Sequence, residues 1–161
     1  LLIDAFTLAA ADGFAGELVI AGDGPARGEI ESCARQSPAA ERIRVLGSVD
    51  EDTKIELLSR AAVLGMPSRR EGFPRVITEA MASGLPIVTA RFPENGATDV
   101  VAQYGSGVVC GTDPAEFAGA LLAAEAGWEG FSHAGLTGAQ SLDWSGIART
   151  LEARAMEVAA R

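Results

Sequence analysis

Two carboxylates in one short stretch are the residues best placed to do chemistry. Glu71 lies in a loop after an apolar run that ends at Met66, and Glu79 lies eight positions further on, inside a helix predicted over residues 75–83. A carboxylate can accept two hydroxyl hydrogen bonds at once, which suits a vicinal diol such as that of a ribose or a hexose. We therefore expect the two carboxylates to reach opposite ends of one ligand held at the start of the helix.

The helix that carries Glu79 is predicted to begin directly after a buried strand. Pro74 suits a first helical turn because its missing N–H would have no partner there, and Gly84 followed by Pro86 predicts the end of the helix. A helix in this position points its free N–H groups and the positive end of its dipole at the edge of the sheet. This arrangement favours an anionic ligand, phosphate above all.

The elements that must position this helix alternate regularly along the chain. Apolar runs predict strands near residues 17–22, 43–47, 62–66, 86–90 and 107–110. Helices are predicted between them, with Asp52 or Thr53 as the cap of the helix that ends near Arg60, and a last helix is predicted to open at Asp143. This alternation is typical of an α/β fold, a Rossmann-like doubly wound parallel sheet with helices on both faces, which binds ligands beyond the carboxyl ends of its strands.

Composition limits the function further. The chain has 161 residues, which fits one domain, and its net charge of −9 argues against nucleic-acid binding through a general basic face. Cys33 and Cys110 lie far apart and are expected to be reduced core residues, and His133 is expected at the surface rather than at a metal. No apolar run is long enough to span a bilayer, so we expect a cytoplasmic protein, with contact at the inner membrane face as an alternative for the full-length molecule.

The central stretch resembles a known family. The run from Glu71 to Pro86, Glu-Gly-Phe-Pro-Arg-Val-Ile-Thr-Glu-Ala-Met-Ala-Ser-Gly-Leu-Pro, matches the EGFP-x-V-x-x-EAMA-x-G-x-P pattern of GT-B glycosyltransferases of the retaining family 4, also called glycosyltransferase group 1. The resemblance covers most of the chain and is to the C-terminal half of the GT-B fold, which binds the nucleotide sugar. It implies transfer of a glycosyl group from a nucleotide-diphosphate sugar to an acceptor, with retention of configuration.

The resemblance also implies roles for individual residues. Glu71 holds the donor sugar as the catalytic residue, and Glu79 binds the ribose hydroxyls. The other substrate-binding residues that it implies are Gly72, Phe73, Pro74, Arg75, Val76, Ile77, Ser68, Gly22, Gly24 and Gly47. No metal or other cofactor is expected, since helix N–H groups, with Arg70 or Arg75 as helpers, can stabilise the charge on the leaving phosphate.

One further segment matches the family less closely, and one aromatic residue matches a position that is expected in the hydrophobic core. The turn Asn95–Val101 resembles the G-G-x-P-E turn of the family, with Asn95 in place of the first Gly and Thr98 in place of Pro. Trp144 matches an aromatic residue of the family and is expected in the core.

The resemblance implies that parts of the family's structure lie outside this chain. Family members open this half with a strand that ends in Gly-Arg, followed by a Lys, and these cations neutralise the diphosphate. The whole chain, 1–161, is therefore expected to be a single donor-binding domain of a two-domain enzyme, inactive alone, which acts with an N-terminal domain that binds a glycan, lipid or small-molecule acceptor. The base, the sugar, the acceptor, the linkage and the oligomeric state are left open.

Four alternatives are weaker. Gly22-x-Gly24-x-x-x-Gly28 has one residue too many for the dinucleotide fingerprint of an oxidoreductase. A glycoside hydrolase that uses the two Glu as acid and nucleophile would not need a phosphate-binding helix start. A non-catalytic nucleotide-binding module would not need to keep both Glu71 and Glu79. A nucleotide-sugar epimerase of the GT-B fold does not usually carry the EGFP and EAMA run.

Overall fold

The computed structural model describes residues 1–142 and Met156. Its helices are α1 Leu2–Ala11, α2 Arg27–Gln36, the 3₁₀ turn η1 Ala40–Arg42, α3 Glu51–Arg60, α4 Arg75–Ala82, α5 Ala97–Tyr104, α6 Pro114–Ala126 and α7 Trp128–Ser141. Its strands are β1 Leu18–Ala21, β2 Ile43–Gly47, β3 Leu64–Met66, β4 Arg70–Glu71, β5 Ile87–Ala90, β6 Glu94–Asn95 and β7 Gly107–Cys110. The five predicted strands are confirmed, and the prediction for Trp144 and the last helix lies outside the described residues.

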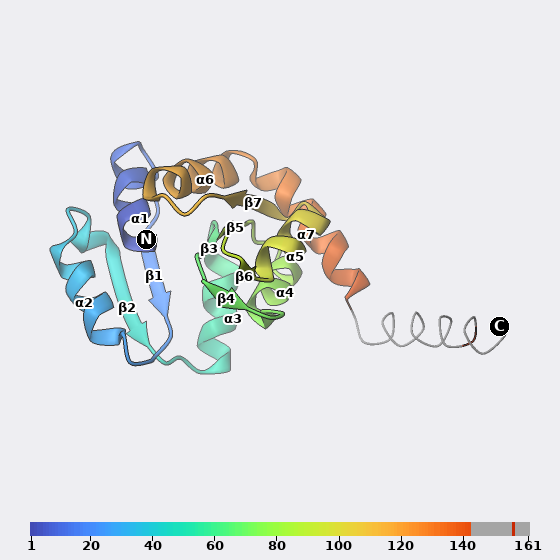
Figure 1. Ribbon diagram of the computed structural model, residues 1–161, viewed down its shortest axis with the longest axis horizontal. Helices are drawn as coiled ribbons and strands as arrows, with labels where there is room; N and C mark the ends of the chain where they lie inside the picture. The colour runs from blue at the N-terminus through green and yellow to red at the C-terminus, as the bar shows by residue number, and fades with distance from the viewer. Residues whose placement is uncertain (143–155, 157–161) are drawn as a thin grey trace.

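All strand pairs are parallel, which confirms the predicted α/β class, but the strands do not form one sheet. β1 pairs with β2, β3–β5–β7 form a second sheet in that order, and β4 pairs with β6 in a short third ladder. In Figure 1 the β1–β2 pair and α2 lie to one side, while β3, β5 and β7 occupy the centre. β1 and β3 make no ladder with each other, so each has one edge without a strand partner in the described part of the chain.

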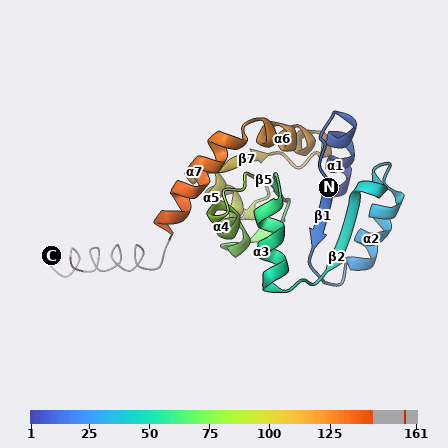
Figure 2. The same cartoon turned by 180° about the vertical axis from the view of Figure 1, so that it is seen from behind.

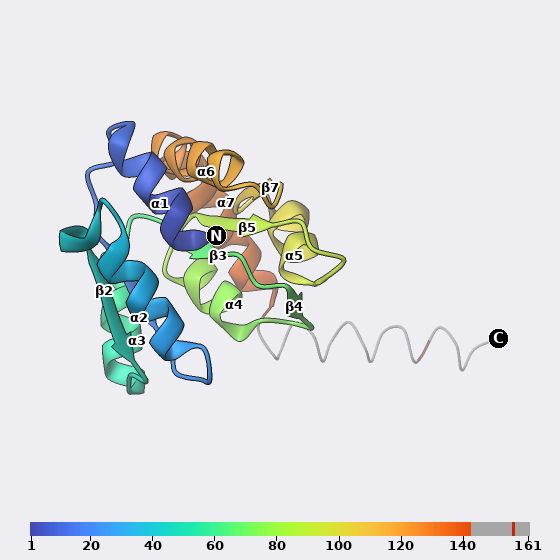
Figure 3. The same cartoon turned by 60° about the vertical axis from the view of Figure 1, so that its left-hand side comes forward.

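The three-stranded sheet has helices on both faces. All four residues of β5 are buried, with Val88 and Ala90 in a core cluster formed with α1 and α6, and Ile87 in a second cluster formed with α3, α4 and α5. Figure 1 shows α1 beside α6 above the sheet, and Figure 3 shows α4 on the opposite side of β3 and β5. Burial on both faces explains why the parallel strands appear as continuous apolar runs.

The end of α4 confirms the predicted stop signal. Gly84 has φ +68°, and the N–H groups of Gly84 and Leu85 donate to the carbonyls of Met81 and Ala80 at 3.0 and 2.9 Å. This is a Schellman motif, in which glycine takes the left-handed conformation and satisfies the last carbonyls of the helix.

Helix α7 was not predicted, because residues 128–141 contain three glycines that weaken helix propensity. Gly135 packs against the backbone of Met81 in α4, and Gly138 lies against Tyr104 and the Met81 side chain. The close approach of α7 to α4 therefore needs Gly135 and Gly138, two of the three glycines that lower the helix propensity of this segment. In Figure 2 α7 descends from α6 past α5 and α4.

Two smaller predictions are wrong. Asp50, not Asp52 or Thr53, caps α3, since its carboxylate accepts the Thr53 N–H at 2.9 Å. Cys33 is exposed on α2 rather than in the core, because α2 covers the β1–β2 pair with few of its residues, whereas Cys110 is half-buried and burial raises the pKa of its thiol. His133 is exposed on α7, as expected. No helix among the described residues has the length and apolarity to cross a bilayer.

Candidate functional site

The start of α4 has no side-chain cap. Pro74 is the N-cap residue, one position before the predicted first turn, and the Ile77 N–H donates to its carbonyl at 3.1 Å. A proline N-cap offers no side-chain oxygen, and among residues 1–142 no side chain caps the N–H groups of the first turn. The helix start therefore remains available to accept an anion, as the sequence predicts.

Glu71 lies in β4 rather than in a loop. Its carbonyl oxygen accepts the Gly96 N–H at 2.8 Å, and β4 pairs in parallel with β6 through Arg70 opposite Glu94 and Glu71 opposite Asn95. Arg70 and Glu94 also form a 3.2 Å ion pair, although both side chains are largely exposed. The ladder thus brings the turn at residues 95–101 beside the Glu71 backbone.

Asn95 is a buried anchor for this turn and not an exposed contact residue. Its amide nitrogen donates to the Thr89 hydroxyl at 3.0 Å and to the Ala90 carbonyl at 2.8 Å, and its amide oxygen accepts the Ala97 N–H at 3.2 Å. Thr89 in turn donates to the Met66 carbonyl at 2.9 Å. The network joins the carboxyl ends of β3 and β5 to the start of α5, which explains how Asn replaces the glycine of the family pattern.

Glu79 is paired with a residue that sequence analysis missed. The Lys54 ammonium of α3 lies 3.0 Å from Glu79 Oε2 and 2.9 Å from Glu51 Oε1. Hydrogen bonds to Glu51 and Glu79 raise the pKa of Lys54. The Lys54–Glu51 spacing of three residues is visible in the sequence, but nothing local indicates the contact between α3 and α4.

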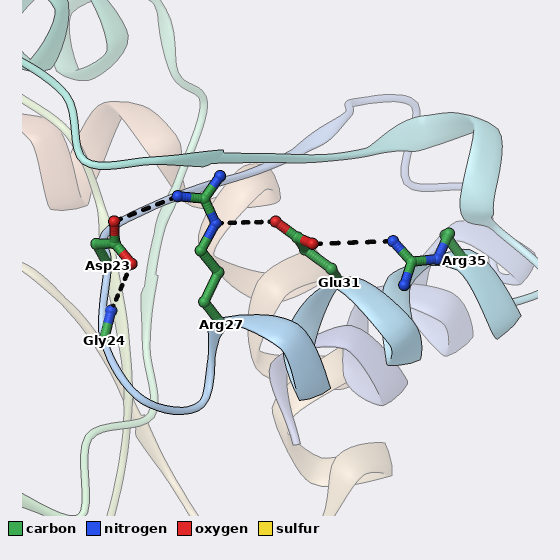
Figure 4. A network of polar contacts seen from close by, with 5 residues as sticks. All are labelled: Asp23, Gly24, Arg27, Glu31 and Arg35. Carbon is green, nitrogen blue, oxygen red and sulfur yellow. Dashed lines mark hydrogen bonds and ion pairs between the residues drawn. The ribbon is translucent and has the colours of Figure 1, made fainter.

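The turn after β1 is held beside the end of β2. The Gly22 N–H donates to the Gly47 carbonyl at 2.7 Å, and Gly22 and Gly47 have φ values of +148° and +74°, which favour glycine. Figure 4 shows how Arg27 reaches Asp23 at 3.2 Å and Glu31 at 2.9 Å, while the Asp23 carboxylate accepts the Gly24 N–H. These two acids raise the pKa of Arg27, Glu31 through a hydrogen bond first.

The Arg27 guanidinium also lies close to Gly47. A Cβ at this position would lie 2.5 Å from Arg27 Nη1. Sequence analysis missed Arg27, and its polar contacts show that it braces the glycine turn.

The predicted site residues differ in what they can present to a ligand. Pro74 and Ile77 are buried, with Ile77 in the core cluster of α4, so only their backbone can face a ligand. Phe73 is 59% exposed, and Gly72 and Arg75 are exposed as well. Ser68, Val76, Glu71 and Glu79 are half-buried. Gly22 and Gly24 are exposed as well, whereas Gly47 is buried at the end of β2. Around the start of α4, the accessible part of the set is the segment at residues 71–76 without the Pro74 side chain, together with the Glu79 side chain.

Two cavities in the described part of the chain lie elsewhere. One of about 400 Å³ lies between α1 and α2 and is lined by Ile3, Thr7, Cys33 and Ser37 among others. Another of about 450 Å³ is lined by residues of α2 and β2, including Ala34, Ile43 and Val45. Neither is lined by Glu71 or Glu79, so the role of these two residues remains a prediction that rests on the helix start and its neighbours. No group of three metal-ligating side chains lies together within residues 1–142.

The chain is similar in sequence to a known protein family and to several individual proteins. The family model described as "Glycosyl transferases group 1" matches residues 1–125. The putative glycosyltransferase EpsF of Bacillus subtilis is 47% identical over 72 residues, which are 45% of this chain and 18% of that protein. A glycogen synthase of Mycobacterium tuberculosis is 33% identical over 106 residues, 66% of this chain and 25% of that protein. The chain thus spans a quarter or less of the length of these two relatives.

Solved structures show the same fold. Sucrose-phosphate synthase from Thermosynechococcus elongatus superposes with a TM-score of 0.77 at 24% identity, over 99% of this chain and 42% of that one. HepE of Anabaena, solved in complex with UDP-glucose, superposes with a TM-score of 0.74 at 22% identity, over 94% of this chain and 44% of that one. The likeness confirms the predicted α/β architecture, that of the C-terminal half of GT-B glycosyltransferases.

Proposed function

Because the chain belongs to the family of group 1 glycosyl transferases, we propose that it binds the nucleotide-diphosphate sugar of a retaining glycosyltransferase. The observation that carries this proposal is the uncapped start of α4, which has Glu71 just before it and Glu79 just inside it. At ~1.5 Å per residue, Glu79 lies about 6 Å along the axis from the first residue of the helix. One ligand with a phosphate at the helix start and hydroxyls on either side suits this spacing.

The charge that develops during glycosyl transfer suggests roles for the start of α4 and for the Arg75 side chain. Cleavage of the bond between sugar and diphosphate builds negative charge on the leaving phosphate, where preorganised donors give the largest gain in rate. The N–H groups of Arg75 and Val76 are the donors at the helix start. Arg70 is already paired with Glu94, so we assign the Arg75 side chain as the helper cation. This mode of stabilisation needs no metal ion.

The two carboxylates have different roles in this proposal. Glu71 holds hydroxyls of the donor sugar, and the β4–β6 ladder that fixes its backbone supports this role. Glu79 holds the ribose hydroxyls, and its position one turn into α4 supports it. The relative that was solved with UDP-glucose makes UDP-glucose the first donor to test.

We further propose that residues 1–161 act as the donor domain of a two-domain enzyme. The facing edges of β1 and β3 have no strand partner in the described residues, which is where the family resemblance puts the strand that carries Gly-Arg and leads to the Lys. A parallel strand in this place would join the two sheets and bring two cations to the phosphate. The acceptor would then bind to the other domain of the enzyme.

The test is nucleotide binding and transfer by the full-length protein. We expect calorimetry to detect binding of UDP, GDP or ADP, and Glu79→Ala to weaken it by ~1–3 kcal/mol, as expected for the loss of hydrogen bonds to a charged group. Glu71→Ala should lower transfer with little change in the affinity for the free nucleotide. Failure to bind all three nucleotides would contradict the proposal. Binding without turnover of any donor would favour the alternative of a non-catalytic nucleotide-binding module.

A further inference from the structure

Lys54 connects α3 to Glu79, the residue that we propose binds the ribose hydroxyls. Its ammonium lies 3.0 Å from Glu79 Oε2 across the α3–α4 interface and 2.9 Å from Glu51 Oε1 within α3. The Lys54 and Glu79 side chains are 29% and 32% exposed, which distinguishes the pair from the exposed Arg60–Glu56 pair of the same helix, at 77% and 65%. Because solvent screens a partly buried ion pair less than an exposed one, the Lys54–Glu79 pair is less screened than the Arg60–Glu56 pair.

Packing fixes where Lys54 points. Leu58, one turn further along α3, is 8% exposed and belongs to the core cluster that includes Ile77 and Ala80 of α4. Residues four apart lie on one face of a helix, so Lys54 shares the face that Leu58 packs against α4. At the other end, the Asp50 cap holds the first turn of α3. The lysine is thus carried by a helix that is anchored on both sides of it.

The contact leaves Glu79 able to bind a ligand. Lys54 lies 3.0 Å from Oε2, and an ionised carboxylate has about four lone-pair sites on its two oxygens. Oε1 and the remaining site on Oε2 can still accept hydroxyl hydrogen bonds. Binding of a diol and pairing with Lys54 are therefore compatible.

We propose that Lys54 is a positioning residue, which holds the ionised Glu79 carboxylate in the orientation that accepts the two ribose hydroxyls. The inference rests on the proposed function, because it assumes that Glu79 binds a ribose. In this role Lys54 contributes to ribose recognition through Glu79 and does not itself contact the nucleotide.

The experiment compares a nucleoside diphosphate with its 2′-deoxy form. Full-length wild-type protein is titrated with UDP, GDP and ADP by calorimetry, and the tightest of them is then compared with its 2′-deoxy analogue. We expect the wild type to prefer the ribose form by roughly tenfold or more, the value of a hydrogen bond to a charged group. Lys54→Met should remove most of this preference while the affinity for the 2′-deoxy form changes little. Lys54→Arg, which can keep the ion pair, should restore it.

Three further variants complete the design. Glu79→Gln should lose the preference as Lys54→Met does, and the double variant should lose no more than Glu79→Gln alone, because the lysine acts only through the glutamate. Arg60→Met is the matched control, since it removes a 2.8 Å ion pair whose two members both lie in α3, and its ribose preference should equal that of the wild type. Thermal melting of each variant confirms that it is folded.

The outcomes separate the two proposals. Equal loss of affinity for both forms in Lys54→Met would place the lysine on the base or the diphosphate and overturn the inference. An unchanged preference would overturn it as well, and in both cases the proposed function would stand. A wild type that binds none of the three nucleotides would instead overturn the proposed function, and the inference with it.

Discussion

The Gly96 N–H donates a 2.8 Å hydrogen bond to the Glu71 carbonyl and so joins the start of α5 to β4, across 25 residues of sequence. The contact is very close, because a Cβ on Gly96 would lie 2.1 Å from the Gly72 carbonyl oxygen and 3.0 Å from that of Glu71. Both of these atoms are backbone atoms and cannot move aside cheaply. The proposed catalytic residue therefore depends on a glycine in another segment.

Gly96→Ala should separate β4 from β6 and destabilise the protein by about 1–3 kcal/mol, the range for overpacking. Gly119→Ala is the matched control, because its Cβ would contact nothing within 4 Å and Gly119 is exposed inside α6. The control should stabilise the protein by roughly 0.5–1 kcal/mol. Urea unfolding of both variants measures the difference, and equal stability of the two would contradict the close contact at Gly96.

Asn95→Ala should lower the free energy of unfolding by about 1–3 kcal/mol, because the Ala90 carbonyl and the Ala97 N–H lose their buried partner. Gln103→Ala, at an exposed position of α5, should change it by less than about 0.5 kcal/mol. Chemical denaturation compares the two variants. If Asn95→Ala were as stable as Gln103→Ala, the network would not anchor the turn.

Gly84 and Gly105 allow backbone strain to be separated from packing. Both have a positive φ, +68° and +62°, but a Cβ on Gly84 would lie 2.8 Å from Ser132 Oγ, whereas one on Gly105 would meet nothing within 4 Å. Gly105→Ala should cost roughly 1–2 kcal/mol from the left-handed conformation alone. Gly84→Ala should cost more, since α7 must also move. Thermal unfolding gives the order, and the reverse order would contradict the packing of α7 on the end of α4.

Acid should weaken α3 through Asp50. Hydrogen bonds from Thr53, through its side chain first and then its N–H, lower the pKa of this carboxyl group. A lowered pKa means that the stabilisation is present above the unfolded value of about 3.9 and is lost as the pH falls through the folded value. Asp50→Asn keeps a capping side chain that does not titrate in this range.

The wild type should therefore lose its stability advantage over Asp50→Asn between roughly pH 5 and pH 2. Urea midpoints of the two proteins across this range provide the measurement. A difference that stays constant with pH would show that the cap does not depend on the charge of Asp50.

Much of the fold could be predicted because its signals are local. Buried parallel strands produce apolar runs, and the Gly84–Pro86 pair marks the end of α4, so five strands and most helices follow from neighbouring residues. The identities of Glu71 and Glu79 and their spacing likewise come from one continuous run. Helix α7 could not be predicted, because its glycines disfavour a helix locally and are favourable only where they let it pack closely on α4.

The amino-acid sequence by itself determined the α/β class, the family and the two candidate carboxylates, since each of these depends on residues that are close together in the chain. Only the tertiary structure decided that Lys54 pairs with Glu79, that Gly96 supports Glu71, and that Asn95 points inward. Each of these contacts joins residues from different elements. The distances between these residues depend on how the helices and strands pack, and a local sequence pattern does not predict that packing.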